Sequence, residues 1–240
     1  MHITRIGITP LKGARHAERR QLRLETTGPV GDRVLCLLDV ERDRVLRTVD
    51  HPRLVLVDAV WDGTVLSLRT PDDRRAIAPT QPTGERLTRD YWGRDAQLEL
   101  LTSPHAALLS AYLGCEVRLA RVAPGEVVYG GPVSLVSTGE LAELAESESA
   151  RFRATLTLDA DRVPEPGTRL HLGDAVIRVR GAVPRCRVID VDPATGRMNR
   201  SLLKDLAARP RRTGELGFGV DADVLVPGVV RAGDRVSPRE

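Results

Sequence analysis

The segment GAVPRCRVIDVDPATG, residues 181–196, places Cys186 between Arg185 and Arg187. A buried structural cysteine usually has apolar neighbours, whereas a thiol between two guanidinium groups ionises more readily because positive charge stabilises the thiolate. The thiolate is the form that attacks electrophiles and binds metal ions. These residue types favour a reactive or metal-binding Cys186, with an ordinary structural thiol as the alternative.

Two further features stand out as candidates. Lys12 is one of only two lysines, the other being Lys204, in a chain with 36 basic residues. A GC-rich genome explains most of this arginine bias, but a lysine retained near the N-terminus remains a candidate. Gly130 and Gly131 directly precede a predicted strand, and a glycine pair lets backbone amides approach an anion closely. On its own, each signal is weak.

The other cysteines and histidines indicate structure rather than chemistry. Cys36 in the run RVLCLLD and Cys115 after a predicted helix end are expected to be buried, inert thiols. His51 is expected in a loop. Three unpaired cysteines argue against a disulfide framework and favour a reducing cytoplasm. No C-x-x-C or H-x-x-x-H pair occurs in the sequence, so a zinc site has no support.

The composition bounds the class of protein. The 240 residues are 41% apolar and 29% charged, which is typical of a globular chain, and aromatics reach only 3%, so the core depends on Leu, Val and Ala. A net charge of +3, without basic blocks interleaved with aromatics, argues against nucleic-acid binding. No apolar run approaches the roughly 20 residues that a membrane-spanning helix needs, and residues 1–10 lack the apolar core of a signal peptide.

Alternating patterns predict a mainly β fold with few helices. Asp62-Gly63 and Gly173-Asp174 lie between such runs and predict hairpin turns. The run 71–87, rich in Pro, Gly and charge, predicts a surface loop. Strands are expected at Gln21–Glu25, Arg33–Asp39, Arg53–Val60, Thr64–Arg69, Gln97–Leu101, Glu116–Val122, Thr155–Leu158, Arg169–Leu172, Ala175–Arg180, Arg187–Val191 and Asp223–Val226.

Three helices are expected. Ser103-Pro104 opens residues 104–113, which stop at Gly114. A capping box at residues 137–140 opens the second helix. The third begins at Ser201 and ends before Pro210. Many short strands with few helices indicate two β-barrel-like domains, with a boundary near residue 120, so that the domains span residues 1–120 and 121–240.

Several segments together resemble one known family. LKGARHAERRQLRLETTGPVGDRVLCLLD and RTVDHPRLVLV resemble the N-terminal β-barrel domain that accompanies a MOSC domain. PVSLVSTGELAEL, ARFRATLTLD, RLHLGDAVIRV, PRCRVIDVDPATG and FGVDADVLVPGVVRAGDRV resemble the MOSC domain itself. The segments occur in the expected order over almost the whole chain. The family includes the mitochondrial amidoxime-reducing component and bacterial relatives that reduce N-hydroxylated compounds.

The resemblance implies roles for particular residues. It places Cys186 on molybdenum as a thiolate, a soft ligand for a redox-active metal. Arginine forks suit phosphate and carbonyl oxygens because they bind them bidentately. The positions that hold the pterin and its phosphate in the family correspond here to Lys12, Gly13, Arg33, Gly130, Gly131, Arg153, Thr155, Pro184 and Arg185.

The chain departs from the family pattern at contacts to the cofactor. Gly13 replaces a loop serine, and Gly130-Gly131 replaces a Thr-Ser pair, so backbone amides must substitute for hydroxyls. Thr155 stands where an Asn is usual. Asp221, included among the cofactor-binding candidates, stands where the mitochondrial proteins have a tyrosine. These departures affect cofactor affinity and substrate choice more than binding of the metal by Cys186.

The resemblance implies a cytoplasmic oxidoreductase that contains the molybdenum cofactor (Mo-molybdopterin) and reduces N-oxygenated small molecules. The sequence contains no haem, flavin or iron–sulfur motif, so electrons are expected from separate redox proteins. Binding to nucleic acid or membrane is not expected. Two alternatives stay open: a sulfur carrier or sulfurtransferase that uses a Cys186 persulfide, and a molybdopterin-binding carrier without turnover.

Overall fold

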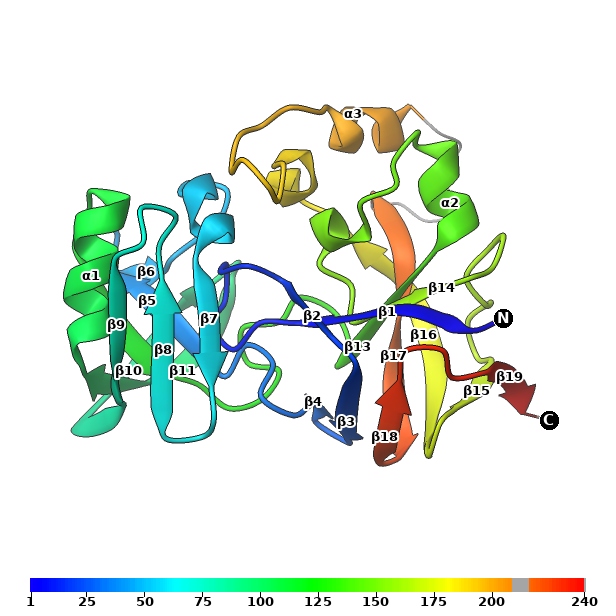
Figure 1. The fold of residues 1–240 in the computed structure, drawn as a ribbon, viewed down its shortest axis with the longest axis horizontal. Helices are drawn as coiled ribbons and strands as arrows, with labels where there is room; N and C mark the ends of the chain where they lie inside the picture. Colours follow the sequence, from blue (N-terminus) through cyan, green and yellow to red (C-terminus); the bar gives the residue numbers. More distant parts are fainter. Residues whose placement is uncertain (209–215, 240) are drawn as a thin grey trace.

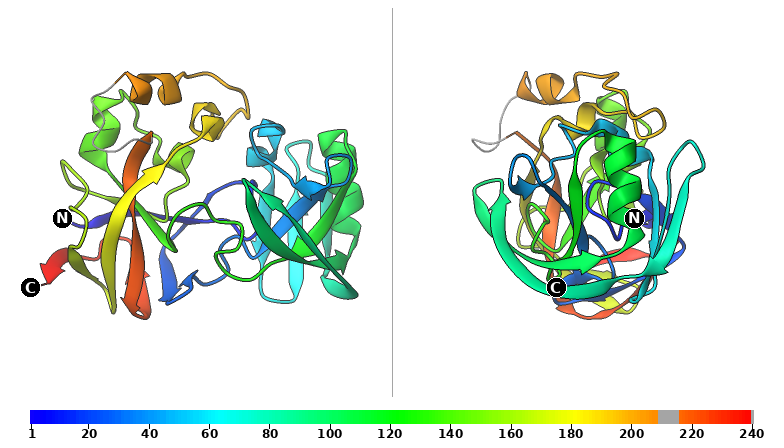
Figure 2. Two further views of the ribbon diagram at one scale, coloured as in Figure 1. Left: turned by 180° about the vertical axis from the view of Figure 1, so that it is seen from behind. Right: turned by 90° about the vertical axis from the view of Figure 1, so that its left-hand side faces the viewer.

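The structure is a computed structural model that describes residues 1–208 and 216–239. In this part of the chain two lobes, built mainly from β-strands, lie side by side (Figure 1). The first lobe contains a sheet of strand order β10-β11-β12-β5-β6, a sheet of order β7-β8-β9 and helix α1. Its strands curve around the interior of the lobe (Figure 2), where the buried side chains form two hydrophobic clusters. Its elements are β5 Leu35–Asp39, β6 Arg44–Val45, β7 Asp58–Trp61, β8 Val65–Arg69, β9 Arg75–Pro79, β10 Gln81–Tyr91, β11 Arg94–Thr102, β12 Val117–Arg121, the 3-10 helix η1 Pro52–Leu56 and α1 Pro104–Leu113.

The second lobe contains an eight-stranded sheet of order β19-β15-β16-β17-β13-β14-β1-β2 and a three-stranded sheet of order β18-β3-β4. Short helices cover one end of the larger sheet (Figure 1). The elements are β1 Ile3–Ile8, β2 Ala17–Arg19, β3 Gln21–Glu25, β4 Gly28–Pro29, β13 Val133–Ser137, β14 Leu156–Leu158, β15 Arg169–Leu172, β16 Ala175–Pro184, β17 Gly217–Val226, β18 Gly228–Arg231, β19 Val236–Arg239, α2 Thr138–Glu143, α3 Leu202–Ala207 and the 3-10 helices η2 Ser149–Phe152 and η3 Arg187–Asp190.

The chain crosses between the lobes more than once. Strand β1 pairs with β14, and β3 pairs with β18, so the first strands of the chain are built into the second lobe. Between β1 and β2 a loop reaches the first lobe, where the Lys12 amide donates to the Leu35 carbonyl at 2.8 Å. This excursion positions Lys12 and Gly13 at the junction of the lobes. After β12 the chain returns through residues 122–132 to β13.

Aliphatic side chains form the cores, as the low aromatic content requires. Ile3, Ile6 and Leu156 belong to the cluster between the sheets of the second lobe. Leu54 and Leu109 belong to a cluster of the first lobe. Phe152 and Phe218 stack with ring centroids 4.5 Å apart below the short helices of the second lobe. This aromatic contact supports the wall of the site described below.

Most of the predicted elements are present. Strands β3 and β15 and helix α1 have the predicted bounds, and six other predicted runs overlap strands β5, β8, β11, β12, β14 and β16. The end of β17 covers the predicted run Asp223–Val226. Asp62-Gly63 joins β7 to β8, and Gly173-Asp174 joins β15 to β16. Ser137 caps α2 by accepting from the Glu140 amide and donating to the Glu140 carboxylate. The expected stop of the third helix at Pro210 lies outside the described residues.

Three predictions are wrong. Residues 187–190 form a 3-10 helix instead of a strand, because Ile189 packs into the core and the Asp190 carboxylate accepts from the Leu203 amide. The first part of Arg53–Val60 is the 3-10 helix η1, with Pro52 at its start. The predicted loop 71–87 contains β9 and most of β10, whose side chains are mostly exposed, so their polarity hides the strand pattern.

The described residues include no helix that is long and apolar enough to cross a membrane.

Candidate functional site

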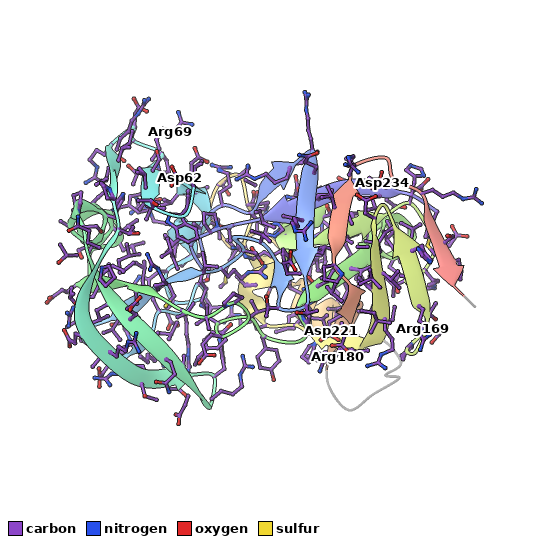
Figure 3. All side chains as sticks on the ribbon, turned by 90° about the horizontal axis from the view of Figure 1, so that it is seen from below. Asp62, Arg69, Arg169, Arg180, Asp221 and Asp234 are labelled. Atoms are coloured by element: carbon purple, nitrogen blue, oxygen red, sulfur yellow. The ribbon has the colours of Figure 1, made fainter. Side chains whose placement is uncertain are left out.

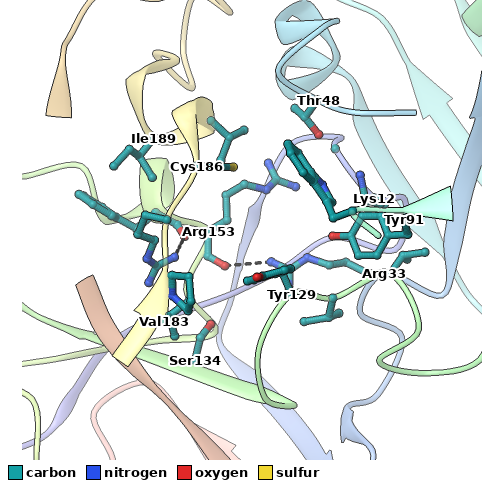
Figure 4. Close-up of a pocket in the computed structure, with 18 of the residues that line it drawn as sticks. Lys12, Arg33, Thr48, Tyr91, Tyr129, Ser134, Arg153, Val183, Cys186 and Ile189 are labelled. Atoms are coloured by element: carbon teal, nitrogen blue, oxygen red, sulfur yellow. Dashed lines mark hydrogen bonds between the residues drawn. The ribbon is translucent and has the colours of Figure 1, made fainter. Parts of the chain in front are cut away.

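A cleft of about 140 Å³ lies between residues of both lobes. Lys12, Tyr91 and Thr48 line one side of it, and Cys186, Val183 and Ile189 line the other (Figure 4). Of the residues predicted for the site, the cleft is lined by Lys12, Gly13, Arg33, Gly131, Arg153, Pro184, Arg185 and Cys186. Gly130, Thr155 and Asp221 are not part of its lining. The fold thus brings together eight predicted residues from segments that are far apart in the sequence.

Cys186 is exposed at the edge of this cleft. It lies two residues after the end of β16, in extended conformation, and immediately precedes η3. The other two thiols differ from it. Cys36 is buried, as predicted, which raises its pKa to about 12. Cys115 is only half-buried, contrary to the prediction, although desolvation still raises its pKa. Cys186 is therefore the thiol that a ligand in the cleft can reach.

The two arginines beside Cys186 point in different directions. Arg187 is exposed, and its guanidinium lies 3.3 Å from the Met198 sulfur. The Arg185 side chain turns inward, where Nε donates to the Phe218 carbonyl and Nη1 to the Phe152 carbonyl, both at 2.8 Å. Its Nη2 is buried and has no hydrogen-bond partner among the described residues. Arg185 thus carries one buried donor that the described residues leave without a partner, and burial lowers its pKa to about 10.

Arg33 and Arg153 each donate a hydrogen bond across the junction of the two lobes. Arg33 Nη2 donates to the Arg153 carbonyl at 2.9 Å, and Arg153 Nη2 donates to the Ala14 carbonyl at 2.8 Å. Both residues have left-handed backbone conformations, with φ of 49° and 53°, which is strained for arginine. Arg33 pairs with Asp32 at 3.0 Å. Burial, followed by repulsion from Arg33, lowers the pKa of Arg153 to about 9.

Lys12 is buried in the loop that reaches across from β1. Its Nζ donates to the Leu46 carbonyl at 2.9 Å and lies 5.0 Å from the centre of the Tyr91 ring. Burial lowers its pKa to about 8. The next residue is Gly13 with φ of 90°, and a Cβ there would lie 2.6 Å from Leu54 Cδ2. Both the positive φ and the local packing therefore favour glycine at position 13.

The glycine pair does not offer both amides to the cleft. The Gly131 amide donates to the Asp221 carboxylate, which lies 3.8 Å from Arg180 in an ion pair (Figure 3). Asp221 is itself buried. A Cβ on Gly131 would lie 2.9 Å from Arg180 Nη1 and 3.0 Å from Asp221 Cγ, so this packing also favours a glycine. The Gly131 amide was expected to bind the ligand in place of a hydroxyl. The Asp221 carboxylate competes with such a ligand, because it already accepts a hydrogen bond from this amide.

Thr155 supports the cleft from behind. Its amide donates to Ser134 Oγ at 3.1 Å, and the Ser134 amide donates to Thr155 Oγ1 at 3.2 Å. Thr155 is buried, whereas Ser134 lines the cleft. The exchange joins β13 to the start of β14. Ser134 is thus the hydroxyl that faces the cleft in this region, and the prediction selected its partner.

Sequence reasoning also missed the aromatic residues of the cleft, which include the neighbours Tyr91 and Trp92 of one hairpin. The clearest available signal was the scarcity of aromatics, because a chain with few of them can place those it has at a site. The remaining missed lining residues are Thr48, Val49, Val127, Val128, Tyr129, Pro132, Ser134, Phe152, Val183, Val188 and Ile189.

A second cavity of about 350 Å³ shares Arg153 and Val188 with the cleft. Its lining combines Arg5 and other arginines with the carboxylates of Glu18 and Glu148. The cleft beside Cys186 has a different balance, since four cations line it and none of the described carboxylates does; the cations are Lys12, Arg33, Arg153 and Arg185. Of these cations Arg33 is paired with the buried Asp32, so the cluster keeps an excess of partly buried positive charge, which favours an anionic ligand. The exposed thiol next to it adds a ligand for a soft metal.

Comparison with known proteins gives matches to two families. Residues 1–116 match the MOSC N-terminal beta barrel domain, and residues 121–237 match the MOSC domain. None of the curated proteins matches the chain significantly.

Several solved structures are similar. The YUAD protein from Bacillus subtilis is 12% identical with a TM-score of 0.41, and the match covers 98% of this chain and 93% of that one. YiiM from Geobacillus stearothermophilus is 18% identical with a TM-score of 0.32, covering 45% and 54%. A protein from Bordetella bronchiseptica, whose structure was determined in solution, is 16% identical with a TM-score of 0.32, covering 45% and 92%.

Proposed function

The chain belongs to the MOSC family, with the N-terminal beta barrel domain that accompanies the MOSC domain, and from this premise we propose that its cleft binds the molybdenum cofactor and reduces an N-oxygenated small molecule. Cys186 is the protein ligand of the metal in this proposal. Lys12, Arg33, Arg153 and Arg185 hold the phosphate and the polar edge of the pterin. The observation that carries the proposal is the placement of an exposed thiol and four largely buried cations around one cleft.

The residues present fit this cofactor in charge. Burial lowers the pKa values of Lys12, Arg153 and Arg185, which means that the cleft on its own disfavours its positive charges. A phosphate dianion relieves this cost and accepts hydrogen bonds from the guanidinium groups. Arg185 lines the cleft, and its buried Nη2 has no partner among the described residues, so its positive charge is only partly compensated by the protein.

The thiol also fits. Cys186 immediately follows Arg185, so adjacent backbone positions bring the metal ligand and a cationic anchor to the same wall. A thiolate is a soft ligand that suits a molybdenum centre already coordinated by dithiolene sulfurs. Cys36 is unsuitable because it is buried and its pKa is raised to about 12. Cys186 is therefore the one of the three cysteines that combines exposure with a position in the cleft.

The bound cofactor supplies two-electron transfer of an oxygen atom. For a hydroxylamine the overall reaction is R–NH–OH + 2 e⁻ + 2 H⁺ → R–NH₂ + H₂O, with the electrons provided by a separate redox protein. The protein's own residues position the reactants. Arg33 and Arg153 each donate a hydrogen bond across the junction of the two lobes, and Ser134 offers a hydroxyl to a ligand in the cleft.

A second candidate function uses the same cysteine as a sulfur carrier. Its support is the exposure of Cys186, since a persulfide must reach both donor and acceptor. The Cys186 thiolate would attack the outer sulfur of a donor enzyme's persulfide, forming a new S–S bond on Cys186 and releasing the donor's thiolate. The cations of the cleft are not required for this step, which makes the reductase the better explanation of the whole site.

One experiment separates these functions. The protein is purified from a host that makes the cofactor, assayed for molybdenum and pterin, and then given an amidoxime with reduced viologen as electron source. Bound cofactor together with turnover of the amidoxime supports the reductase. Bound cofactor without turnover of any N-oxygenated compound supports a molybdopterin-binding carrier. A metal-free protein that gains about 32 Da, the mass of one sulfur atom, on the Cys186 peptide after incubation with a cysteine desulfurase contradicts both and supports sulfur transfer.

A further inference from the structure

Aromatic residues are concentrated at the cleft. The chain has two Trp, three Tyr and two Phe, and four of these seven, Tyr91, Trp92, Tyr129 and Phe152, line the cleft. Tyr91 and Phe152 are buried, whereas Trp92 is 39% exposed and Tyr129 is 48% exposed. The hydrophobic cores inside the lobes consist mainly of aliphatic side chains, and neither Trp92 nor Tyr129 belongs to one of them. Their position at the opening of the cleft requires another explanation.

Trp92 occupies a position that does not suit tryptophan. It forms with Gly93 the two-residue turn between β10 and β11, and both residues have positive φ, 55° and 77°. Asn and Gly are the residues that such a turn favours, and a bulky side chain there is strained. The Arg47 guanidinium lies 4.3 Å from the centre of the Trp92 ring and pairs with Asp90 at 3.1 Å. The indole is thus held in place by Arg47 while retaining exposed surface.

Tyr129 is held in a similar way. Arg94, the residue after the same turn, lies 5.5 Å from the centre of the Tyr129 ring and 5.3 Å from that of Tyr91. Arg94 Nη2 also donates to the Val128 carbonyl at 2.8 Å, which ties the segment that carries Tyr129 to the hairpin. Two exposed rings, each beside an arginine, are therefore presented at the same cleft as Cys186.

We propose that Trp92 and Tyr129 form an aromatic surface that binds the ring of the substrate and makes the protein selective for flat, ring-bearing N-oxygenated compounds over small aliphatic ones. This inference rests on the proposed function for the reaction itself. The cations that suit the phosphate lie in the buried part of the cleft, at Lys12, Arg33 and Arg153. The exposed rings are at its solvent side and are thus available to a molecule that enters and leaves.

The test compares benzamidoxime with acetamidoxime, which differ in a phenyl and a methyl group. Trp92→Asn suits the turn, so it should fold at least as stably as the wild type. Stacking on an aromatic ring changes affinity by about two- to tenfold. We expect Trp92→Asn to lower the ratio of kcat/KM for benzamidoxime to that for acetamidoxime by about fivefold, mainly through KM. Tyr129→Ala should lower the same ratio, and Trp61→Phe, outside the cleft, should not.

The content of molybdenum and pterin is measured in each variant. An unchanged ratio, with equal losses for both substrates, contradicts the proposal. Loss of pterin from Trp92→Asn also contradicts it, because the ring would then hold the cofactor. If the wild type reduces neither compound, the proposed reductase function is contradicted, but binding of ring-bearing compounds by the aromatic surface can still be tested. The Trp61→Phe protein contains Trp92 as its single tryptophan. Saturable quenching of its fluorescence by benzamidoxime, but not by acetamidoxime, supports the aromatic surface. Equal quenching by the two compounds overturns the proposal.

Discussion

The buried Lys12 should make the stability of the cofactor-free protein depend on pH in a way that can be assigned to one side chain. Burial lowers the pKa of Lys12 from 10.5 to about 8. Because the unfolded chain binds this proton more tightly than the folded protein, the charge costs stability below pH 8. A pKa lowered by this amount corresponds to about 3 kcal/mol. The cost is lost as the pH rises from the folded pKa toward the unfolded one, so stability should rise over this interval.

The measurement is urea unfolding of the cofactor-free wild type and of Lys12→Met over a series of pH values. Methionine removes the charge, together with the hydrogen bond to Leu46 and the contact with Tyr91, so the slopes are compared and not the absolute stabilities. The free energy of unfolding of the wild type should rise relative to that of Lys12→Met by about 2 kcal/mol between about pH 7.5 and about pH 9.5. Cys36 and Tyr91, whose pKa values burial raises to about 12, are present in both proteins.

The chain offers a matched control, since its other lysine, Lys204, is exposed on α3. Lys204→Met should track the wild type at all pH values. An anion in the cleft stabilises charged Lys12, so inorganic pyrophosphate should stabilise the wild type at neutral pH more than Lys12→Met. If the difference in the free energy of unfolding between wild type and Lys12→Met does not change with pH, the reasoning that the charged Lys12 side chain is destabilised by burial is refuted.

Three further predictions concern the cleft and its frame. Arg185→Met should speed release of bound pterin about tenfold to a hundredfold through lost charge-assisted hydrogen bonds, whereas Arg74→Met, on the exposed hairpin, should leave release unchanged in a pterin-fluorescence assay; equal effects contradict the assignment. Asp221→Asn removes a carboxylate from the Gly131 amide and should tighten pyrophosphate binding in calorimetry, and weaker binding would show that Asp221 assists the ligand. Gly219→Ala meets the Leu135 carbonyl at φ of 68° and should lower the free energy of unfolding by about 2 kcal/mol or more, while Gly181→Ala, with open space around its Cβ position, should cost far less; similar losses would contradict the packing argument.

Local chemistry in the sequence was sufficient for the regular elements. The proline start and the glycine stop of α1, and the Asp62-Gly63 and Gly173-Asp174 turns, each depend on a few adjacent residues. The same reasoning failed at 187–191, because Ile189 and Asp190 are engaged by residues near 150 and 200, which no local pattern reveals. It also failed at β9 and β10, where backbone pairing with neighbouring strands outweighs a polar, proline-containing sequence.

The site residues also differ in whether the local sequence could reveal them. Cys186 became a candidate through its own neighbours, and it does line the cleft, but the approach of Lys12 depends on a loop that crosses between the lobes. Only resemblance to a family connected these segments in advance. The ion pair of Asp221 with Arg180, and its hydrogen bond from Gly131, could not be foreseen because they join β17, β16 and a loop. Trp92 was missed because a tryptophan in a tight turn contradicts turn preferences, and such contradictions are expected at functional sites.

The central claim, that Cys186 holds molybdenum in the cleft, is tested most directly by the metal content of cysteine variants purified from a cofactor-producing host. The wild type and Cys115→Ser should retain comparable molybdenum per chain. Cys186→Ser should retain less than about a tenth of that amount, because a hydroxyl is a hard and poorly ionised ligand. Circular dichroism should show that all three proteins are folded. Equal molybdenum in the wild type and in Cys186→Ser would contradict the assignment of the metal to this thiol.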